Sequence, residues 1–247
     1  VNDSFSGEIE IDCLIIGGGA AGLTAALAAA EDGASTLVAE RENQLSGSTA
    51  LSSGLIPAAE TKAQKRQLID DNKRTFVEDI MNKNNSSADP SLVNLCVENI
   101  TFALDWLEET HGIPFQVLDD FLYPSHTNFR MHAVPEVTGG ALINYLEKAV
   151  SELDIYVSCD LQIINLVKSS KGKILGAIGQ RPDGSIEKIS SGVSVKSINN
   201  LKQTANTIRA NRPLNCSPLS KELALLPICA PITPPNISNP ANTISTV

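Results

Sequence analysis

The chain has 247 residues with 19 basic and 28 acidic side chains, which give a net charge of −9. Its composition, 42% hydrophobic and 19% charged, is typical of a folded protein rather than a disordered or fibrous one. Aromatic residues make up only 4% of the chain and no basic stripe is present, so we expect no nucleic-acid partner and no binding to anionic membrane surfaces.

The five cysteines and three histidines give no metal or disulfide signature. The cysteines form no CxxC pair, and the histidines have no ligand-like spacing on one helix. We therefore expect no metal site, and a reducing, cytoplasmic location. Residues 13–30 are an uncharged run as long as a membrane span, but they are rich in glycine and alanine, which drive membrane insertion poorly, so we expect no membrane span.

The first forty residues predict a strand–helix–strand unit. The apolar run at residues 9–16 is typical of a buried parallel strand. Residues 20–32 predict a helix that stops at Gly33, and residues 35–40 predict the second strand. This order is that of a βαβ unit.

A polar loop at residues 43–60 and a charged helical stretch at residues 61–83 follow. Asp89 is the expected N-cap of the next helix, which starts at Pro90 and ends before Gly112. A further helix is predicted at residues 139–153. Short strands are expected at residues 155–157, 161–167, 174–179 and 186–189. The turns between them predict that these strands form a small antiparallel meander.

The composition changes near residue 190. All ten aromatic residues lie before this point, whereas seven of the 13 prolines lie after it. We expect residues 1–190 to form the folded domain and residues 191–247 to be an irregular tail, rich in Pro, Ser and Asn, that is not an independent domain.

The motif that carries chemistry is Gly17-x-Gly19-x-x-Gly22, between the first strand and the first helix. Gly17 permits a tight turn, Gly19 lets the backbone approach a pyrophosphate, and Gly22 lets the helix pack close to the strand. The helix N-terminus offers unpaired N–H groups to phosphates. Glu40, at the end of the second strand, can accept hydrogen bonds from ribose hydroxyls and disfavours a 2′-phosphate. The simpler interpretation is a glycine-rich turn with a surface glutamate.

The fingerprint alone leaves NAD and FAD open. The next segment contains Ser46-Gly47-Ser48-Thr49-Ala50-Leu51-Ser52-Ser53-Gly54, in which turn formers and short hydroxyl side chains suit close wrapping of a cofactor. An NAD domain normally passes more directly from its second strand into the next helix. The alternative is an ordinary flexible surface loop.

At this point the sequence resembles the fumarate reductase/succinate dehydrogenase flavoprotein family, an FAD-dependent group that includes 3-ketosteroid dehydrogenases. The resemblance is strongest over residues 9–60, where the glycine fingerprint, Glu40 and a stretch of the form G-G-x-S/T-x-x-S-x-G match, and extends to about residue 189. Thr138-Gly139-Gly140 is a weaker match. The resemblance implies a Rossmann-like FAD-binding α/β domain, a parallel sheet with helices plus the small antiparallel meander.

The resemblance also implies roles for particular residues. Gly17, Gly19 and Gly22 would face the FAD pyrophosphate, Glu40 the adenosine ribose, and Ile163 would be the backbone contact to adenine. Membrane-bound members link their flavin to a histidine where Ser48 stands here, so the FAD should be non-covalent. The remaining expected cofactor-binding residues are Ala20, Ala21, Arg41, Ser48, Thr49, Ala50, Ser53 and Gly54.

The family pattern breaks after residue 189. The expected Gly-Gly turn, the capping domain and the C-terminal flavin-binding segment have no counterpart in residues 190–247. We therefore expect the front portion of such a flavoprotein, joined to an unrelated tail by truncation or a shifted reading frame.

Hydride transfer needs a dry pocket and a proton donor beside the flavin. Arg130 could hold a substrate carboxylate, and His132 could donate a proton. The simpler interpretation, which the missing cap favours, is that both are surface loop residues that at most support the cofactor. Trp106 is expected to lie in the core. His111, at the C-terminal end of a predicted helix, is expected to interact favourably with the helix dipole. The acidic pairs Asp70-Asp71 and Glu108-Glu109 are expected on solvated faces.

The function implied is an FAD-dependent oxidoreductase that reduces or desaturates a C–C bond next to a carbonyl or carboxylate. Its small-molecule substrate and its electron donor or acceptor are not identified by the sequence. A catalytically inactive flavoprotein fragment or interaction module, and an NAD-binding Rossmann module, are the alternatives.

Overall fold

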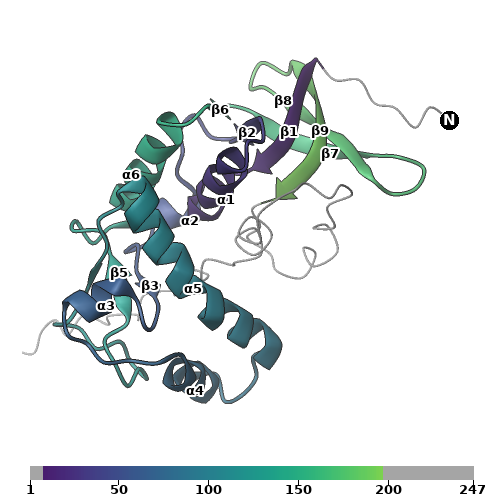
Figure 1. Cartoon of the computed structure of the whole chain (residues 1–247). Coiled ribbons are helices and arrows are strands. Elements are labelled where there is room, and N and C mark those ends of the chain that lie inside the picture. Colours follow the sequence, from purple (N-terminus) through teal and green to yellow (C-terminus); the bar gives the residue numbers. More distant parts are fainter. Residues whose placement is uncertain (1–7, 197–247) are drawn as a thin grey trace, which may run out of the picture.

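The computed structural model describes residues 8–196, which form an α/β structure built on a six-stranded sheet (Figure 1). The strand order is β6-β2-β1-β9-β8-β7. The first four strands in this order run parallel, and β9, β8 and β7 are antiparallel neighbours. The strands are β1 (Ile9–Ile16), β2 (Thr36–Ala39), β6 (Ile155–Ser158), β7 (Gln162–Lys168), β8 (Ile174–Gln180) and β9 (Ile186–Lys196). The Rossmann-like class predicted from the sequence is confirmed.

The first strand–helix–strand unit forms as predicted. Leu14 and Ile15 of β1 are completely buried, as their apolar run requires of a central strand. The strand pairs in parallel with β2, with Ile16 opposite Ala39. The start of this pairing is fastened by Asp12, whose carboxylate accepts hydrogen bonds from the backbone amide and the hydroxyl of Ser35.

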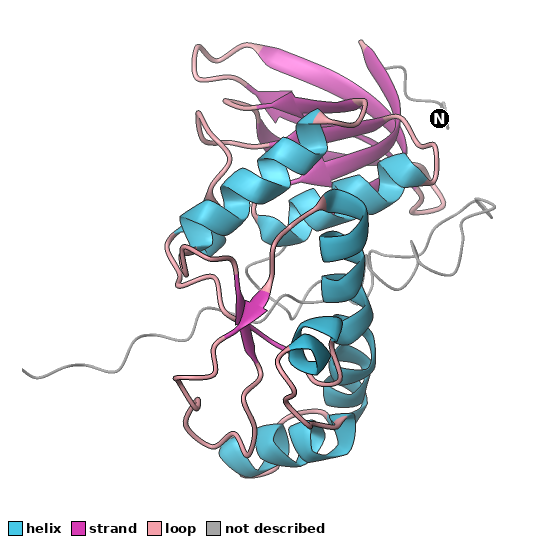
Figure 2. Cartoon of the chain, turned by 60° about the vertical axis from the view of Figure 1, so that its left-hand side comes forward, coloured by secondary structure: helices cyan, strands magenta, loops and turns pink. Residues whose placement is uncertain are grey.

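Helices cover one face of the sheet (Figure 2). α1 (Ala20–Glu31), α6 (Gly139–Ser151) and the C-terminal end of α5 (Pro90–His111) share one hydrophobic core with β1 and β2. Trp106 lies in this core, as predicted. Within residues 8–196, no helix is both long enough and apolar enough to cross a lipid bilayer.

A second part of the structure, which the sequence did not predict, lies alongside α5, away from the main sheet (Figure 2). It contains a three-stranded antiparallel sheet in the order β3-β5-β4, made of β3 (Ile56–Pro57), β4 (Gln116–Val117) and β5 (Met131–Ala133). The helix expected over residues 61–83 is broken into α3 (Lys62–Arg66) and α4 (Lys73–Lys83). The break falls at Leu68, whose φ of 57° is left-handed and incompatible with a continuous helix.

The expected meander is part of the main sheet rather than a separate unit. The strand predicted at residues 186–189 continues to Lys196 and pairs in parallel with the whole of β1, from Ile9 opposite Ile189 to Ile16 opposite Lys196. The first predicted strand of this region, β6, pairs with β2 instead. The described sheet therefore extends beyond residue 190, and the rest of the expected tail, residues 197–247, lies outside the described residues.

Candidate cofactor-binding site

The glycine turn between β1 and α1 brings a strand end and a helix N-terminus into close contact. Gly17 has a φ of 107°, and its amide donates to the Ala39 carbonyl oxygen of β2 at 2.9 Å. A Cβ atom at Gly22 would overlap the Gly17 carbonyl oxygen, so α1 can start this near the strand only because Gly22 lacks one. The packing role predicted for Gly22 is confirmed.

Several backbone amides at this corner remain open. The Ala20 amide donates to Thr49 Oγ1 at 3.3 Å, whereas the amides of Gly19, Ala21 and Gly22 have no acceptor among the residues that the structure describes. Gly19 is the N-cap of α1 and has no side chain to cap the helix. Open amides at the positive end of a helix dipole form a suitable cradle for a diphosphate.

Glu40 lies beside this cradle and is only 6% exposed. Its Oε2 accepts a hydrogen bond from the Gly18 amide at 2.7 Å, and its Oε1 accepts one from the Glu42 amide at 3.0 Å. Both carboxylate oxygens are thus held in place, and each can accept a further hydrogen bond. This arrangement fits the ribose-binding position expected from the sequence, although it occupies the Gly18 amide.

The Ser/Gly loop packs between the N-termini of α1 and α6. Its short helix α2 (Gly47–Ala50) approaches Gly19, since a Cβ at Gly47 would lie 3.5 Å from the Gly19 Cα. On the other side, the Gly139 amide donates to the Ser52 carbonyl oxygen at 2.9 Å, and a Cβ at Gly139 would overlap the Thr49 carbonyl oxygen. The loop is therefore fixed by the surrounding elements.

The other expected cofactor residues lie around this loop and the end of the sheet. Ser48 and Ala50 are half-buried in α2, and Ser53 is exposed just before the buried Gly54. Arg41 is exposed and pairs with Glu42. Ile163 lies on β7 two residues after Leu161, whose amide donates to the Glu40 carbonyl oxygen at 2.8 Å. Helix α2 therefore lies beside the glycine corner, and β7 starts next to the end of β2 that carries Glu40.

Arg130, one of the two candidate catalytic residues, is only 1% exposed and is held away from solvent. Its Nε donates to Asp71 Oδ2 at 2.7 Å, its Nη2 donates to Asp71 Oδ1 at 2.8 Å, and its Nη1 pairs with Asp79. Although burial favours a higher pKa for Asp79, the hydrogen bonds from the Thr127 amide and Arg130 make its pKa lower than usual. The solvated position expected for Asp71 is wrong, because Arg130, 59 residues later in the chain, covers it.

His132, the other candidate, is completely buried and has both ring nitrogens engaged. Its Nδ1 lies 2.8 Å from the Arg130 carbonyl oxygen, which can only accept, so Nδ1 carries the proton. Nε2 then accepts a hydrogen bond from Thr61 Oγ1 at 2.7 Å. Burial lowers the pKa of His132, which favours this neutral form. The geometry assigns His132 a structural role in fastening β5 to the start of α3.

His111 also has a partner that the sequence did not reveal. Its Nε2 lies 3.1 Å from Glu31 Oε1, and the other oxygen of the same carboxylate accepts a hydrogen bond from Trp106 Nε1 at 3.1 Å. Burial lowers the pKa of His111 despite the nearby carboxylate. His111 and Trp106 thus join α5 to α1 through Glu31, and the dipole interaction expected for His111 stays a prediction.

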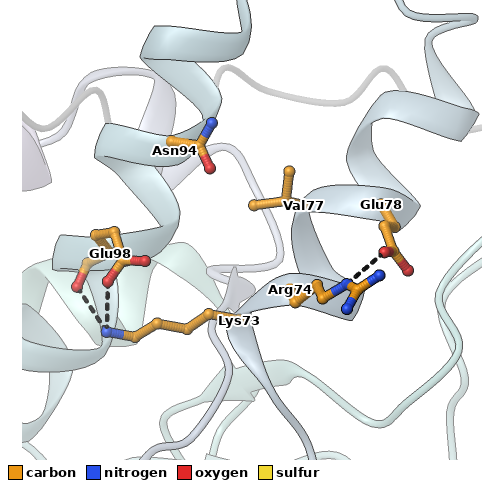
Figure 3. Close-up of a pocket in the computed structure, with 6 residues that line it drawn as sticks. All are labelled: Lys73, Arg74, Val77, Glu78, Asn94 and Glu98. Carbon is orange, nitrogen blue, oxygen red and sulfur yellow. Dashed lines mark hydrogen bonds and ion pairs between the residues drawn. The ribbon is translucent and has the colours of Figure 1, made fainter.

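The structure also contains a surface hollow between α4 and α5, at the opposite end of the molecule from α1 (Figures 1 and 3). Two ion pairs border it, Lys73 with Glu98 and Arg74 with Glu78. The four charged side chains pair with one another, so this hollow has no surplus charge to attract an ionic ligand. Within residues 8–196, no group of three His, Cys, Asp or Glu side chains is arranged to hold a metal ion.

The glycine corner, its open amides and the fixed Glu40 define a dinucleotide-binding α/β domain. The chain belongs to the FAD binding domain family, which matches residues 12–224, and FAD is its cofactor. The open amides suit the FAD diphosphate and the carboxylate suits its ribose, so the residues present fit this group.

The chain is similar to several flavoprotein reductases. It is 30% identical to a urocanate reductase from Eggerthella lenta over 68% of this chain and 28% of the relative, and 30% identical to an NADH:fumarate oxidoreductase from Klebsiella pneumoniae over 64% and 17%. The solved structure of a flavocytochrome c3 fumarate reductase superposes with a TM-score of 0.71 at 25% identity, covering 77% of this chain and 34% of that chain. The chain thus spans about a third or less of the length of these relatives.

Proposed function

We propose that this chain forms the FAD-binding part of an oxidoreductase that reduces or desaturates a C–C bond next to a carbonyl or carboxylate. The observation that carries the proposal is the pairing of open amides at Gly19, Ala21 and Gly22 with the Glu40 carboxylate fixed beside them. The relatives whose names specify urocanate reductase and fumarate oxidoreductase activity support the reaction class.

In this proposal each residue of the corner has a defined task. The amides of Gly19, Ala21 and Gly22 bind the diphosphate, and Glu40 accepts hydrogen bonds from the ribose hydroxyls. Thr49 fixes α2 against the start of α1, so that the loop forms one wall of the path toward the flavin. When bound, FAD supplies hydride-transfer chemistry.

The proposed binding is non-covalent, because Ser48 lacks the imidazole needed for a histidyl–flavin bond. Arg130 and His132 are not proposed as substrate-binding groups, since Arg130 is paired with Asp71 and Asp79 and both nitrogens of His132 are engaged. The substrate pocket and its proton donor are therefore proposed to be formed by residues other than this buried pair.

The proposal is tested by incubating the full chain with FAD, desalting it and recording its ultraviolet–visible spectrum. We expect retained oxidised-flavin absorbance, and release of all flavin into the supernatant on acid precipitation. A colourless protein, or one that binds NAD but not FAD in parallel calorimetry, would contradict the proposal. Flavin that stays in the acid precipitate would contradict the non-covalent assignment alone.

The role of Glu40 is tested separately by Glu40→Ala. Removing the carboxylate leaves the Gly18 and Glu42 amides without their acceptor and removes the ribose acceptor, so the Kd for FAD should rise at least about tenfold. Asp119→Ala, which removes an exposed carboxylate from the connection between β4 and β5, is the matched control and should leave the Kd for FAD unchanged. Equal affinities in the two variants would exclude Glu40 from the binding site.

A further inference from the structure

The turn at residues 158–161, between β6 and β7, encloses the end of β2 that carries Glu40. The Glu40 amide donates to the Ser158 carbonyl oxygen at 2.9 Å, and the Leu161 amide donates back to the Glu40 carbonyl oxygen at 2.8 Å. The Asp160 amide donates to the Glu42 carbonyl oxygen at 2.9 Å. Any displacement of this turn would therefore move the backbone that positions the Glu40 carboxylate.

This turn contains an unfavourable backbone conformation. Asp160 has a φ of 54°, in the left-handed region that residues with a Cβ atom rarely adopt. Such a conformation persists only where neighbouring groups hold it, so the turn needs support from outside.

Arg181 supplies that support from the connection between β8 and β9. Its Nη1 donates to the Cys159 carbonyl oxygen at 2.6 Å, and its Nη2 donates to Ser158 Oγ at 2.8 Å. Its Nε is anchored on Glu187 Oε1 of β9 at 2.5 Å. The side chains of Arg181 and Glu187 are 28% and 24% exposed, so the contact is partly shielded from water and each hydrogen bond involves a charged group.

We propose that Arg181 is a positioning residue for the adenosine half of the FAD site, acting through the turn at residues 158–161 on Glu40. This inference rests on the proposed function, because it assumes that Glu40 meets the adenosine ribose. Arg181 itself is expected to make no contact with the diphosphate. Its guanidinium instead links β9 to the turn at residues 158–161, and this turn holds the backbone of Glu40.

The test compares Arg181→Ala with wild type for binding of FAD, by flavin fluorescence, and of ADP, by calorimetry. ADP contains the adenosine and diphosphate but no flavin, so an effect at the adenosine half should weaken both ligands equally. We expect the Kd to rise about tenfold for each. Arg181→Lys, which can keep one of the two bonds to the turn, and Glu187→Gln, which weakens only the anchor, should give smaller increases.

Arg66→Ala is the matched control, because Arg66 also donates to a carboxylate, that of Glu108, and to a backbone carbonyl, that of Phe115, but lies away from the glycine corner. It should lower the melting temperature of the ligand-free protein to a similar degree while leaving both Kd values unchanged.

Wild-type affinity for FAD and ADP in Arg181→Ala would overturn the inference alone. If that variant does not fold, wild-type affinity in both Arg181→Lys and Glu187→Gln overturns it equally. A wild-type chain that binds no FAD overturns the proposed function and this inference with it.

Discussion

A Cβ atom at Gly22 would overlap the Gly17 carbonyl oxygen, so the start of α1 can lie against the end of β1 only with glycine at this position. The constraint is steric rather than conformational, since Gly22 is inside the helix and has no left-handed φ. The same contact sets the distance between the strand end and the open amides. One missing methyl group therefore determines the geometry of the whole corner.

Gly22→Ala is expected to destabilise the fold and weaken FAD binding, because α1 must move away from β1 to make room for the methyl group. Overpacking of this kind costs about 1–3 kcal/mol, which thermal unfolding followed by circular dichroism would measure. Gly140→Ala is the control, because a Cβ there would lie an ordinary 4.0 Å from the Ala50 carbonyl oxygen. Equal melting temperatures in the two variants would show that the corner tolerates the methyl group.

Arg130 illustrates a different effect at the residue scale, that of a buried charge with two partners. Removing it leaves the Asp71 and Asp79 carboxylates without their cation, so Arg130→Met should lower the free energy of unfolding by about 3–5 kcal/mol. Denaturant titration would measure this loss. Arg66→Met, which breaks a more exposed pair with Glu108, should cost less than about 1 kcal/mol. Similar losses in both variants would contradict the importance of burial.

At the scale of elements, α5 joins the two parts of the structure. Its C-terminal half packs in the core under the main sheet through Leu104 and Leu107, and its N-terminal half packs against α4 through Val93 and Val97. Its start is defined by Asp89, whose carboxylate accepts a hydrogen bond from the Ser91 amide at 2.8 Å. The stability of this helix end therefore affects the packing of α4.

Asp89→Ala removes the N-cap of α5 and should destabilise the protein by about 1 kcal/mol. Asp89→Asn retains an acceptor oxygen and should cost much less. Thermal melts of both variants would test this, with the loss expected to appear at the α4 end of α5 as faster amide hydrogen exchange. Equal stabilities of the two variants would exclude the capping hydrogen bond as the cause.

At the scale of the whole molecule, three histidines, one completely and two partly buried, connect stability to pH. Burial lowers the pKa of His111, His126 and His132 below the ordinary value of 6.5. The unfolded chain therefore binds protons more readily, so the stabilisation is complete above pH 6.5 and declines as the pH falls toward the folded-state pKa values.

The melting temperature should accordingly fall between pH 7.5 and pH 5.5, two values that bracket the ordinary pKa of histidine near 6.5. His126→Gln should show a smaller fall than wild type, because one of the three groups no longer titrates. Scanning calorimetry of both proteins over this range would measure the difference. A fall of the same size in both proteins would remove His126 from this explanation.

The parts of the fold that the sequence predicted depend on local signals. The strand, glycine turn, helix and Glu40 lie within 32 consecutive residues, and the caps Asp89 and Gly112 define the ends of α5 from adjacent residues. The small sheet could not be predicted, because its strands have only two or three residues. The extension of β9 was missed because its small polar residues, such as Ser190 and Ser191, resemble those of a tail.

The candidate site divides in the same way. Glu40 was predicted from its distance to the glycines, and its place beside Gly18 agrees with that expectation. The burial of Asp71 and the contact between Arg181 and the turn at residues 158–161 were not predicted, because each depends on partners far apart in the chain. Side-chain pairing between distant elements follows from the tertiary fold and leaves no short-range pattern.

The pairing of β1 with β9 has a consequence for how the chain acquires its structure. Ile9 and Ile189 are direct neighbours in the sheet, so the central strand gains its second partner only after a loop of about 180 residues has closed. During synthesis, the edge of β1 that pairs with β9 therefore has no strand partner until β9 has left the ribosome. Such a high contact order predicts slow folding, with docking of the final strand as the step that chaperones would have most reason to protect.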